Sequence, residues 1–223
     1  MNKVVISLSG GMDSATLLAL ARNYEKEVIA VSYHYGQRHA RELESATALA
    51  LHYGVEHLIL DLRAVETIFK GSALTSSEIE VPEGHYEAES MKDTVVPNRN
   101  MIFLSLATAL AISRKFEAVG YAAHQGDHAI YPDCRKAFTD NMDRVIRAAT
   151  NWDIELWTPF TERSKAEIVQ NGLMLDVPYQ LTWSCYKGGE KACGKCGTCV
   201  ERIEAFQLAG EVDPIPYESY EAL

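Results

Sequence analysis

The part of the sequence that most constrains the fold is residues 7–14, which read SLSGGMDS. An apolar run at residues 4–6 precedes this stretch, and apolar residues at helical spacing follow it at 15–21. A strand, a glycine turn and a helix are therefore expected in succession. Gly10 and Gly11 allow backbone angles that a side chain would forbid, and they let a ligand approach the main chain. Since the free amides at the start of a helix favour an anion, we expect a phosphate-binding loop.

This loop differs from two common nucleotide-binding motifs, because it lacks the Walker A lysine and the G-x-G-x-x-G spacing. Residues 9–14 instead resemble the SGGxDS loop of the PP-loop ATP pyrophosphatases, which holds the β,γ-pyrophosphate and exposes the α-phosphate to attack. The alternative is a tight turn without a ligand, which the serines and the aspartate at these spacings disfavour. The nucleotide-binding residues that we predict are Ser7, Leu8, Ser9, Gly10, Gly11, Met12, Asp13, Ser14, Ala15, Thr16 and Leu17.

The composition is that of an acidic globular protein. The chain has 223 residues, with 21 basic and 31 acidic side chains and a net charge of −10. A broad nucleic-acid-binding surface would need the opposite charge, although the acidity also simply favours solubility. No apolar run approaches the length of a membrane span, and the first residues lack a signal-peptide pattern. We therefore expect a cytoplasmic protein that binds neither nucleic acid nor a membrane.

Apolar, strand-like runs alternate with helical patterns along most of the chain. We predict strands at 4–6, 28–33, 57–62, 117–123 and 154–157, and helices at 15–21, 38–53, 101–115 and 138–151. This alternation is typical of an α/β fold, here a Rossmann-like parallel sheet of about five strands with helices on both faces. We divide the chain into an ATP-binding α/β domain at 1–180 and a C-terminal, cysteine-rich segment at 181–223 that packs on it.

Residues 70–96 break the pattern and predict a long loop, which is either a lid over the site or a floppy insertion. Asn98 follows this loop and is placed to cap the next helix. Arg99 then stands in the first helical turn, where the helix dipole disfavours a cation, so we expect an anion nearby. The alternative for Arg99 is a solvated surface side chain.

The predicted fourth strand leads into residues 124–135, which are polar and irregular. Parallel sheets bind ligands beyond the carboxyl ends of their strands, so this stretch suits a planar, hydrogen-bonding substrate with a carboxylate. Any one of its side chains could instead be satisfied within the loop. Further on, residues 164–167 form a capping box that leaves Lys165 in the first turn of a helix. The substrate-binding residues that we predict are Asn98, Arg99, Asp127, Tyr131, Asp133 and Arg135.

Four cysteines cluster near the C-terminus as C-x7-C-x2-C-x2-C, namely Cys185, Cys193, Cys196 and Cys199. Four thiolates suit a tetrahedral zinc ion and leave no open coordination position, so the predicted role of the zinc is structural. An iron–sulfur cluster is the main alternative, and disulfides are disfavoured in a cytoplasmic chain. A helix is expected at 195–209. The fifth cysteine, Cys134, lies apart and is either a buried small residue or a site residue.

Taken together, the motifs resemble the 7-cyano-7-deazaguanine synthases, the nitrile-forming enzymes of queuosine biosynthesis. The matching stretches lie at 9–14, 96–100, 126–127, 131–135 and 164–167 and in the four-cysteine cluster, in order along nearly the whole chain. The resemblance implies an adenine nucleotide alpha hydrolase-like fold, ATP, Mg²⁺, a structural Zn²⁺ and often a homodimer. The implied reaction is the ATP-dependent conversion of 7-carboxy-7-deazaguanine and ammonia to 7-cyano-7-deazaguanine, through an adenylated carboxylate and an amide.

The same resemblance suggests roles for five catalytic residues. Ser9 and Ser14 would stabilise the departing pyrophosphate, and Asp13 would orient Mg²⁺. Lys165 stands where many PP-loop enzymes have a lysine that reaches the phosphates, and it would neutralise their charge together with Arg99. Attack at the α-phosphate predicts AMP and pyrophosphate as products, whereas descriptions of the family also give ADP and phosphate.

Three other functions remain open at this point. One is a PP-loop enzyme that transfers sulfur to tRNA, although only Cys134 is left over for that chemistry. Another is a relative that stops at the amide or serves the modification of DNA with 7-deazaguanine. The third is a zinc-ribbon binding module without catalysis, against which the intact phosphate loop argues. Since no glutaminase-like domain is visible, free ammonia is the expected nitrogen donor.

Overall fold

The structure is a computed structural model that describes residues 2–85 and 88–219. Its centre is a sheet of five parallel strands in the order β3-β2-β1-β4-β5. The strands are β1 (Lys3–Ser7), β2 (Glu27–His34), β3 (Glu56–Asp61), β4 (Ala118–Gly120) and β5 (Glu155–Trp157). The predicted five-stranded parallel sheet is therefore confirmed.

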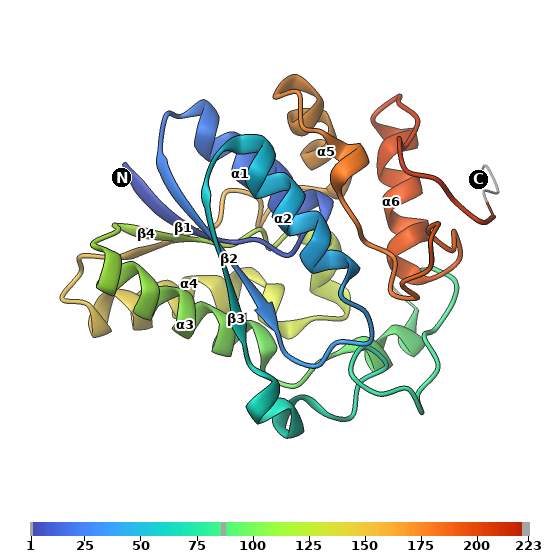
Figure 1. Cartoon of the computed structure of the whole chain (residues 1–223), viewed down its shortest axis with the longest axis horizontal. Coiled ribbons are helices and arrows are strands. Elements are labelled where there is room, and N and C mark those ends of the chain that lie inside the picture. Colours follow the sequence, from blue (N-terminus) through green and yellow to red (C-terminus); the bar gives the residue numbers. More distant parts are fainter. Residues whose placement is uncertain (1, 86–87, 220–223) are drawn as a thin grey trace.

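Helices cover both faces of this sheet, as the sequence predicts (Figure 1). They are α1 (Met12–Asn23), α2 (Arg41–Tyr53), α3 (Arg99–Arg114), α4 (Lys136–Ala149), α5 (Lys165–Met174) and α6 (Gly197–Leu208). Alternate side chains of a strand point to opposite faces. Val4 and Ile6 accordingly pack in one core with α1, α2, α5 and α6. Val5 packs in a second core with α3 and α4.

The strand order places the functional end of the sheet. Strand β1 is followed by α1 on one face and leads to β2, whereas its neighbour β4 is followed by α4 on the other face and leads to β5, so the connections after these two adjacent strands run in opposite directions. A crevice forms at such a switch point, outside the carboxyl ends of the strands. Both the 7–14 loop and the stretch after β4 begin at this edge.

The two predicted helix caps have different outcomes. The capping box of α5 is confirmed, because the Ser164 hydroxyl accepts from the Glu167 amide at 3.3 Å and the Glu167 carboxylate accepts from the Ser164 amide at 2.8 Å. The predicted cap by Asn98 is wrong, since its side chain makes no capping hydrogen bond. Asn98 has a left-handed backbone (φ 55°, ψ 18°), whereas a capping side chain requires the extended region.

The segment at 70–96 is packed against the rest of the molecule over its described part. Its buried residues include Ser72, Ala73, Met91 and Thr94, each with 0% of its surface exposed. The Gly84 amide donates to the Lys195 carbonyl at 2.9 Å, which joins the segment to the cysteine-rich region. These contacts disfavour a floppy insertion at residues 70–85 and 88–96, while a lid motion stays a prediction.

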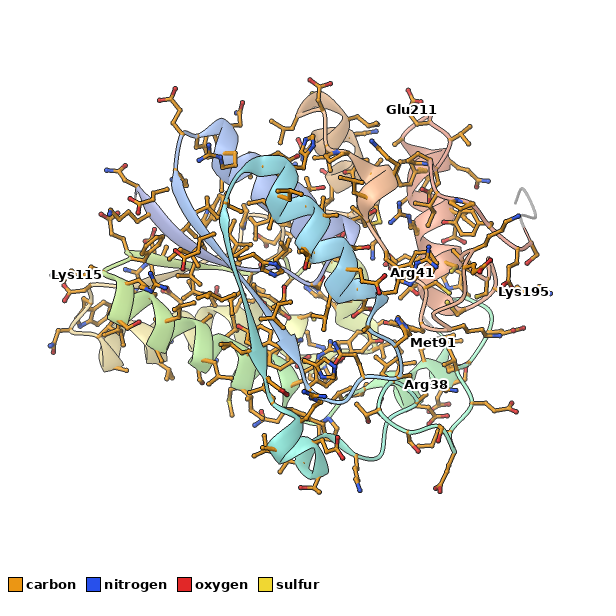
Figure 2. The ribbon with its side chains drawn as sticks, viewed as in Figure 1. Arg38, Arg41, Met91, Lys115, Lys195 and Glu211 are labelled. Atoms are coloured by element: carbon orange, nitrogen blue, oxygen red, sulfur yellow. The ribbon has the colours of Figure 1, made fainter. Side chains whose placement is uncertain are left out.

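The cysteine-rich segment packs directly on the α/β core. The Trp183 amide donates to the Gly10 carbonyl at 2.9 Å. In the same segment, the fully buried Arg202 guanidinium is paired with Asp213, with N–O distances of 2.6 and 2.9 Å. Figure 2 shows Arg41 at the end of α2 that faces α6, and its guanidinium lies 3.9 Å from the centre of the Trp183 ring. The phosphate loop and the cysteine-rich segment therefore share one interface.

One helical stretch among the described residues, Glu89–Arg114, is long and apolar enough to cross a membrane by length and composition alone. The expectation that no apolar run has this length is corrected accordingly. The stretch comprises a short 3₁₀ helix and α3, and α3 packs on β1 and β4. A core helix of a globular protein passes the same test, so the finding is weak evidence for a membrane span.

Candidate functional site

A cleft of about 230 Å³ opens at the carboxyl ends of β1, β2 and β4. Its lining includes the phosphate loop, the start of α5 and the residues after β4. It also includes aromatic side chains, the starts of α2 and α3 and the cysteine-rich segment. The sequence therefore predicted the location of this cleft from the strand ends.

The phosphate loop has a shape that depends on glycine at position 10. Gly10 has φ +88°, and a Cβ there would lie 2.1 Å from the Glu42 carbonyl oxygen. The Ser9 and Ser14 hydroxyls are 3.0 Å apart, and the Gly11 amide donates to the Ser9 hydroxyl at 3.2 Å. These hydrogen bonds fix the conformation of the turn, which lines the cleft.

The predicted nucleotide-binding residues divide into two groups. Those that line the cleft are Ser7, Leu8, Ser9, Gly11, Asp13 and Ser14. Those outside the lining are Gly10, Met12, Ala15, Thr16 and Leu17, and all of them are buried. Because α1 begins at Met12, its first amides have no intrahelical partner and are available to an anion. Nucleotide contact by each residue stays a prediction.

A buried charge cluster stands beside the loop. The Lys165 ammonium lies 2.6 Å from the Glu201 carboxylate, 3.3 Å from that of Asp13 and 3.3 Å from the His124 ring. His124 in turn lies 3.3 Å from Asp127. Burial alone would lower the pKa of Lys165, but the carboxylates of Asp13, Glu201 and Asp127 raise it. The lysine therefore stays a cation at the edge of the phosphate site.

Asp13 has a carboxylate oxygen that fits a magnesium ion. Its Oδ2 atom faces Lys165, whereas its Oδ1 atom is buried and has no hydrogen-bond partner within the described part of the chain. Carboxylate oxygens and nucleotide phosphates are the ligands that Mg²⁺ usually takes in such sites. Asp13 is thus suited to a Mg²⁺ ion that accompanies ATP.

Another part of the cleft lining is aromatic and carries charges. Tyr33 stacks on Phe103 with ring centres 3.9 Å apart, and Tyr35 meets Phe103 edge-on at 5.4 Å. The Arg99 guanidinium lies 5.9 Å from the centre of the Tyr35 ring and 3.4 Å from its hydroxyl. Glu42, from the first turn of α2, lines the same region, and burial raises its pKa to about 7. Such walls suit a planar ligand with polar edges.

The predicted substrate residues are only partly gathered here. Arg99, Asp127 and Tyr131 line the cleft, and the Tyr131 hydroxyl is 3.2 Å from that of Tyr186. A second set, Asn98, Asp133 and Arg135, lies outside the lining, although Asp133 accepts from the Asn100 amide at 3.4 Å. Substrate binding by all six stays a prediction.

The four clustered cysteines fit a tetrahedral metal ion. Their sulfur atoms all lie within 4.8 Å of one another and are buried. Cys199 lies 3.9 Å from Cys193 and 3.5 Å from Cys196. Zinc–sulfur bonds of about 2.3 Å place sulfurs about 3.8 Å apart, so the spacing matches. Main-chain amides of Lys187 and Cys193 donate to the Cys185 sulfur, each at 3.4 Å, which further suits thiolate ligands.

Cys134 lines the cleft, but its thiol is unreactive. Its sulfur lies 3.2 Å from the Tyr121 hydroxyl and 5% of the residue's surface is exposed. Burial raises its pKa well above the usual range. Cys134 is therefore a neutral thiol, whereas nucleophilic cysteines are thiolates.

Sequence reasoning missed three charged residues of the site, namely Arg38, Glu42 and Glu201. Glu201 follows Cys199 by two positions on α6 and is buried against Lys165, and its closeness in sequence to the cysteine cluster is the available signal. Glu42 gives no comparable signal, because charged residues are common in the first turn of a helix. It reaches the cleft only through the packing of α2 beside Gly10.

Curated relatives match the chain from end to end. The protein "7-cyano-7-deazaguanine synthase 1" of Colwellia psychrerythraea is 52% identical over 216 residues, covering 97% of this chain and 99% of the relative. The "7-cyano-7-deazaguanine synthase" of Marinobacter nauticus is 52% identical over 217 residues, covering 97% and 98%. That of Caldicellulosiruptor saccharolyticus is 53% identical over 216 residues, covering 97% and 96%.

Solved structures with the same fold are more distant. The NMN synthetase of Francisella tularensis has a TM-score of 0.54 and 18% identity, covering 94% of this chain and 78% of that one. The NH3-dependent NAD synthetase of Campylobacter jejuni has a TM-score of 0.52 and 18% identity, covering 81% and 66%. At this identity the likeness concerns the fold alone.

A family model assigns the chain at the level of the family. The model described as "Queuosine biosynthesis protein QueC" matches residues 3–210, which include the phosphate loop, the charge cluster and all four clustered cysteines. Together with relatives that share about half of their residues with it, this match shows that the chain belongs to the QueC family of queuosine biosynthesis proteins.

Proposed function

We propose that the chain is an ATP-dependent carbon–nitrogen ligase that converts 7-carboxy-7-deazaguanine and ammonia to 7-cyano-7-deazaguanine. The observation that carries the proposal is the joining of two sites in one cleft. A phosphate loop with Lys165 and an aromatic group of side chains with Arg99 line the same cleft. The full-length relatives named 7-cyano-7-deazaguanine synthase support the same reaction.

The first step activates the carboxylate. A carboxylate oxygen of the substrate attacks the α-phosphorus of ATP, and the bond to the β,γ-pyrophosphate breaks. The loop amides and the hydroxyls of Ser9 and Ser14 stabilise the charge on the leaving pyrophosphate. Lys165 stays a cation in its carboxylate cluster and neutralises the same phosphates. The result is a mixed anhydride with AMP as a good leaving group.

The next steps install nitrogen and remove oxygen. Ammonia attacks the activated carbonyl carbon, loses a proton and displaces AMP, which gives the amide. The amide oxygen then attacks the α-phosphorus of a second ATP as one N–H proton is lost. Departure of AMP with loss of the second N–H proton leaves the nitrile. Each turnover in this scheme consumes two ATP and releases two AMP and two pyrophosphates.

The metals have separate roles in this proposal. Asp13 would hold Mg²⁺ through its unpartnered Oδ1 atom, and the ion would add positive charge at the phosphates. The four cysteines would hold a structural Zn²⁺, since four protein ligands leave no open position. The zinc would then fasten the segment at 181–223 to the ATP-binding unit at 1–180.

The neutral state of Cys134 weighs against transfer of sulfur to tRNA. Such a reaction needs a reactive thiolate outside the structural metal site. Of the five cysteines in the sequence, Cys134 is the one outside the cluster of four, and burial keeps it protonated. A homodimer and a cytoplasmic location are further proposals, which rest on the family resemblance. Sedimentation velocity of the purified protein tests the dimer.

The decisive experiment is mass spectrometry of the products formed from ATP, Mg²⁺, ammonium and 7-carboxy-7-deazaguanine. A nitrile with AMP supports both the reaction and attack at the α-phosphate. Amide without nitrile moves the chain to relatives that stop at the amide, and ADP with phosphate overturns the α-phosphate chemistry. Absence of any conversion overturns the proposed function.

A pair of serine variants tests the loop in the same assay. Ser14→Ala removes a hydroxyl at the phosphate loop and is expected to abolish most turnover. Ser105→Ala is the matched control, because both serines donate to a main-chain carbonyl three or four residues back, and Ser105 is exposed on α3. Equal turnover in both variants would remove the loop from the mechanism.

A further inference from the structure

Arg99 and Glu42 are two charged residues of the cleft that lack direct ionic partners among the described residues, and Arg99 lies against the aromatic side chain of Tyr35. Within residues 2–85 and 88–219, no carboxylate lies within the 4.0 Å ion-pair distance of the Arg99 guanidinium. No cation lies within that distance of the Glu42 carboxylate in the same part of the chain, and no hydrogen bond to that carboxylate is formed there. Over the described part of the chain, Arg99 and Glu42 thus stand in the cleft as a cation and a carboxylate without ionic partners, whereas Arg38, which also lines it, donates to the main-chain carbonyls of Ala73 and Ile79.

Keeping such charges out of water costs free energy unless something binds them. Glu42 illustrates the cost, because burial raises its pKa to about 7 even though the charge of Arg99 acts in the opposite direction. The charges of Arg99 and Glu42 therefore interact electrostatically, although the two side chains form no ion pair. A ligand that carries both an anion and N–H donors would satisfy both groups at once.

The walls around these charges restrict the shape of that ligand. Tyr35 and Phe103 stand edge to face at 5.4 Å, and the Arg99 guanidinium packs over the Tyr35 ring. Tyr186 and Trp183 line the same cleft from the cysteine-rich segment. A cleft lined by aromatic side chains with a few charged groups suits a planar heterocycle with polar edges.

We propose that Glu42 accepts hydrogen bonds from the N1–H and 2-amino groups of the 7-deazaguanine ring, with Arg99 binding the carboxylate of the same molecule. This inference rests on the proposed function and adds a specificity residue to it. An ionised carboxylate has two accepting oxygens and no donor, which matches two adjacent N–H groups. Glu42 would thereby select a guanine-like ring over rings without this donor edge.

The adenine ring of ATP is a poorer match for this pair of charges. Its corresponding edge offers one donor and one acceptor, so a carboxylate would meet a nitrogen lone pair. Adenine also has no anion for Arg99, and the phosphates of ATP belong at the loop beside Lys165. A cation and a carboxylate together thus favour the carboxylated deazaguanine.

The variant Glu42→Gln tests the proposal. Glutamine keeps the size of the side chain but replaces one acceptor by a donor, which opposes the substrate N–H groups. We expect KM for 7-carboxy-7-deazaguanine to rise roughly tenfold to a hundredfold, as for loss of a hydrogen bond to a charged group. KM for ATP should stay within about twofold of wild type, because in this proposal ATP forms no hydrogen bond with Glu42 that the variant would lose.

A substrate analogue gives a readout that general damage to the protein would not produce. Wild type should discriminate against 7-carboxy-7-deazahypoxanthine, which lacks the 2-amino group, and Glu42→Gln should lose most of that discrimination. Glu44→Gln is the matched control, because Glu44 is in the same first turn of α2 but is exposed. It should behave as wild type with both compounds.

The outcomes separate this inference from the proposed function. If wild type converts 7-carboxy-7-deazaguanine but Glu42→Gln keeps full discrimination, or loses affinity for ATP instead, the role of Glu42 is wrong. If wild type converts nothing, the proposed function fails, and calorimetric binding of both compounds to wild type and variant still decides whether Glu42 reads the ring. If Glu42→Gln unfolds, Glu42→Asp takes its place in the test. We expect Glu42→Asp to bind 7-carboxy-7-deazaguanine more weakly but still to discriminate against the analogue without the 2-amino group. Loss of this discrimination in Glu42→Asp would overturn the inference.

Discussion

The Lys165 ammonium lies 2.6 Å from the Glu201 carboxylate, and these two residues connect the phosphate site to the cysteine cluster. Lys165 begins α5, whereas Glu201 stands on α6 two positions after Cys199. The helix that supplies Cys199 to the cluster therefore also supplies a counter-charge to the lysine. The cysteine-rich segment is thus part of the site as well as a support for the fold.

Glu201→Gln should lower kcat while leaving the protein folded. The amide still accepts a hydrogen bond from Lys165, but the lysine loses a full counter-charge and shifts toward Asp13. A misplaced phosphate-binding group costs roughly tenfold to a hundredfold in rate. Steady-state kinetics with ATP as the varied substrate measures the effect. The control is Glu204→Gln on the same helix, where the carboxylate faces His85 at 3.8 Å, and a similar loss of rate there would deny Glu201 a special role.

Removal of metal should affect both stability and the site. Metal analysis of the purified protein is expected to find one zinc per chain, and a strong chelator should lower Tm sharply, because binding energy at such sites is folding energy. Cys193→Ser should have the same effect without chelator. Iron with visible absorbance would indicate an iron–sulfur cluster instead. Unchanged Tm and activity in the metal-free protein would contradict a structural metal.

The parts of the site that the sequence predicted are those that local patterns encode. The glycine turn after β1 and the C-x2-C spacing specify geometry within a few residues, so both could be located without a structure. Glu42 and Glu201 reach the cleft through the packing of α2 and α6, which no local pattern records. Asn98 was misjudged for a related reason, since residue type suggested a cap while the chain path imposed a left-handed turn.

Gly10→Ala should destabilise the protein more than an ordinary substitution at a left-handed glycine. Two effects would add up: alanine is strained at the positive φ of +88°, and its methyl group would lie 2.1 Å from the Glu42 carbonyl oxygen. Gly54→Ala isolates the first effect, since Gly54 also has positive φ (+61°) but nothing within 4 Å of its Cβ position. We expect a loss of about 1 kcal/mol for the control and clearly more for Gly10→Ala. Urea unfolding measures both, and equal losses would show that the close approach of α2 is unimportant.

Cys134→Ala should retain most of the activity, because a buried neutral thiol is a poor nucleophile. Burial raises the pKa of Cys134 well above its usual range, so the fraction of thiolate stays small at neutral and mildly alkaline pH. Alkylation of Cys134 in the folded protein should accordingly be slow at pH 8 and become fast only on unfolding, as peptide mass spectrometry can follow. The variant removes a sulfur that lies 3.2 Å from the Tyr121 hydroxyl, so a drop in activity of a few fold is expected from lost packing. Complete loss of nitrile formation in a folded Cys134→Ala protein would contradict an adenylate mechanism that uses no thiol and would favour covalent catalysis through this residue.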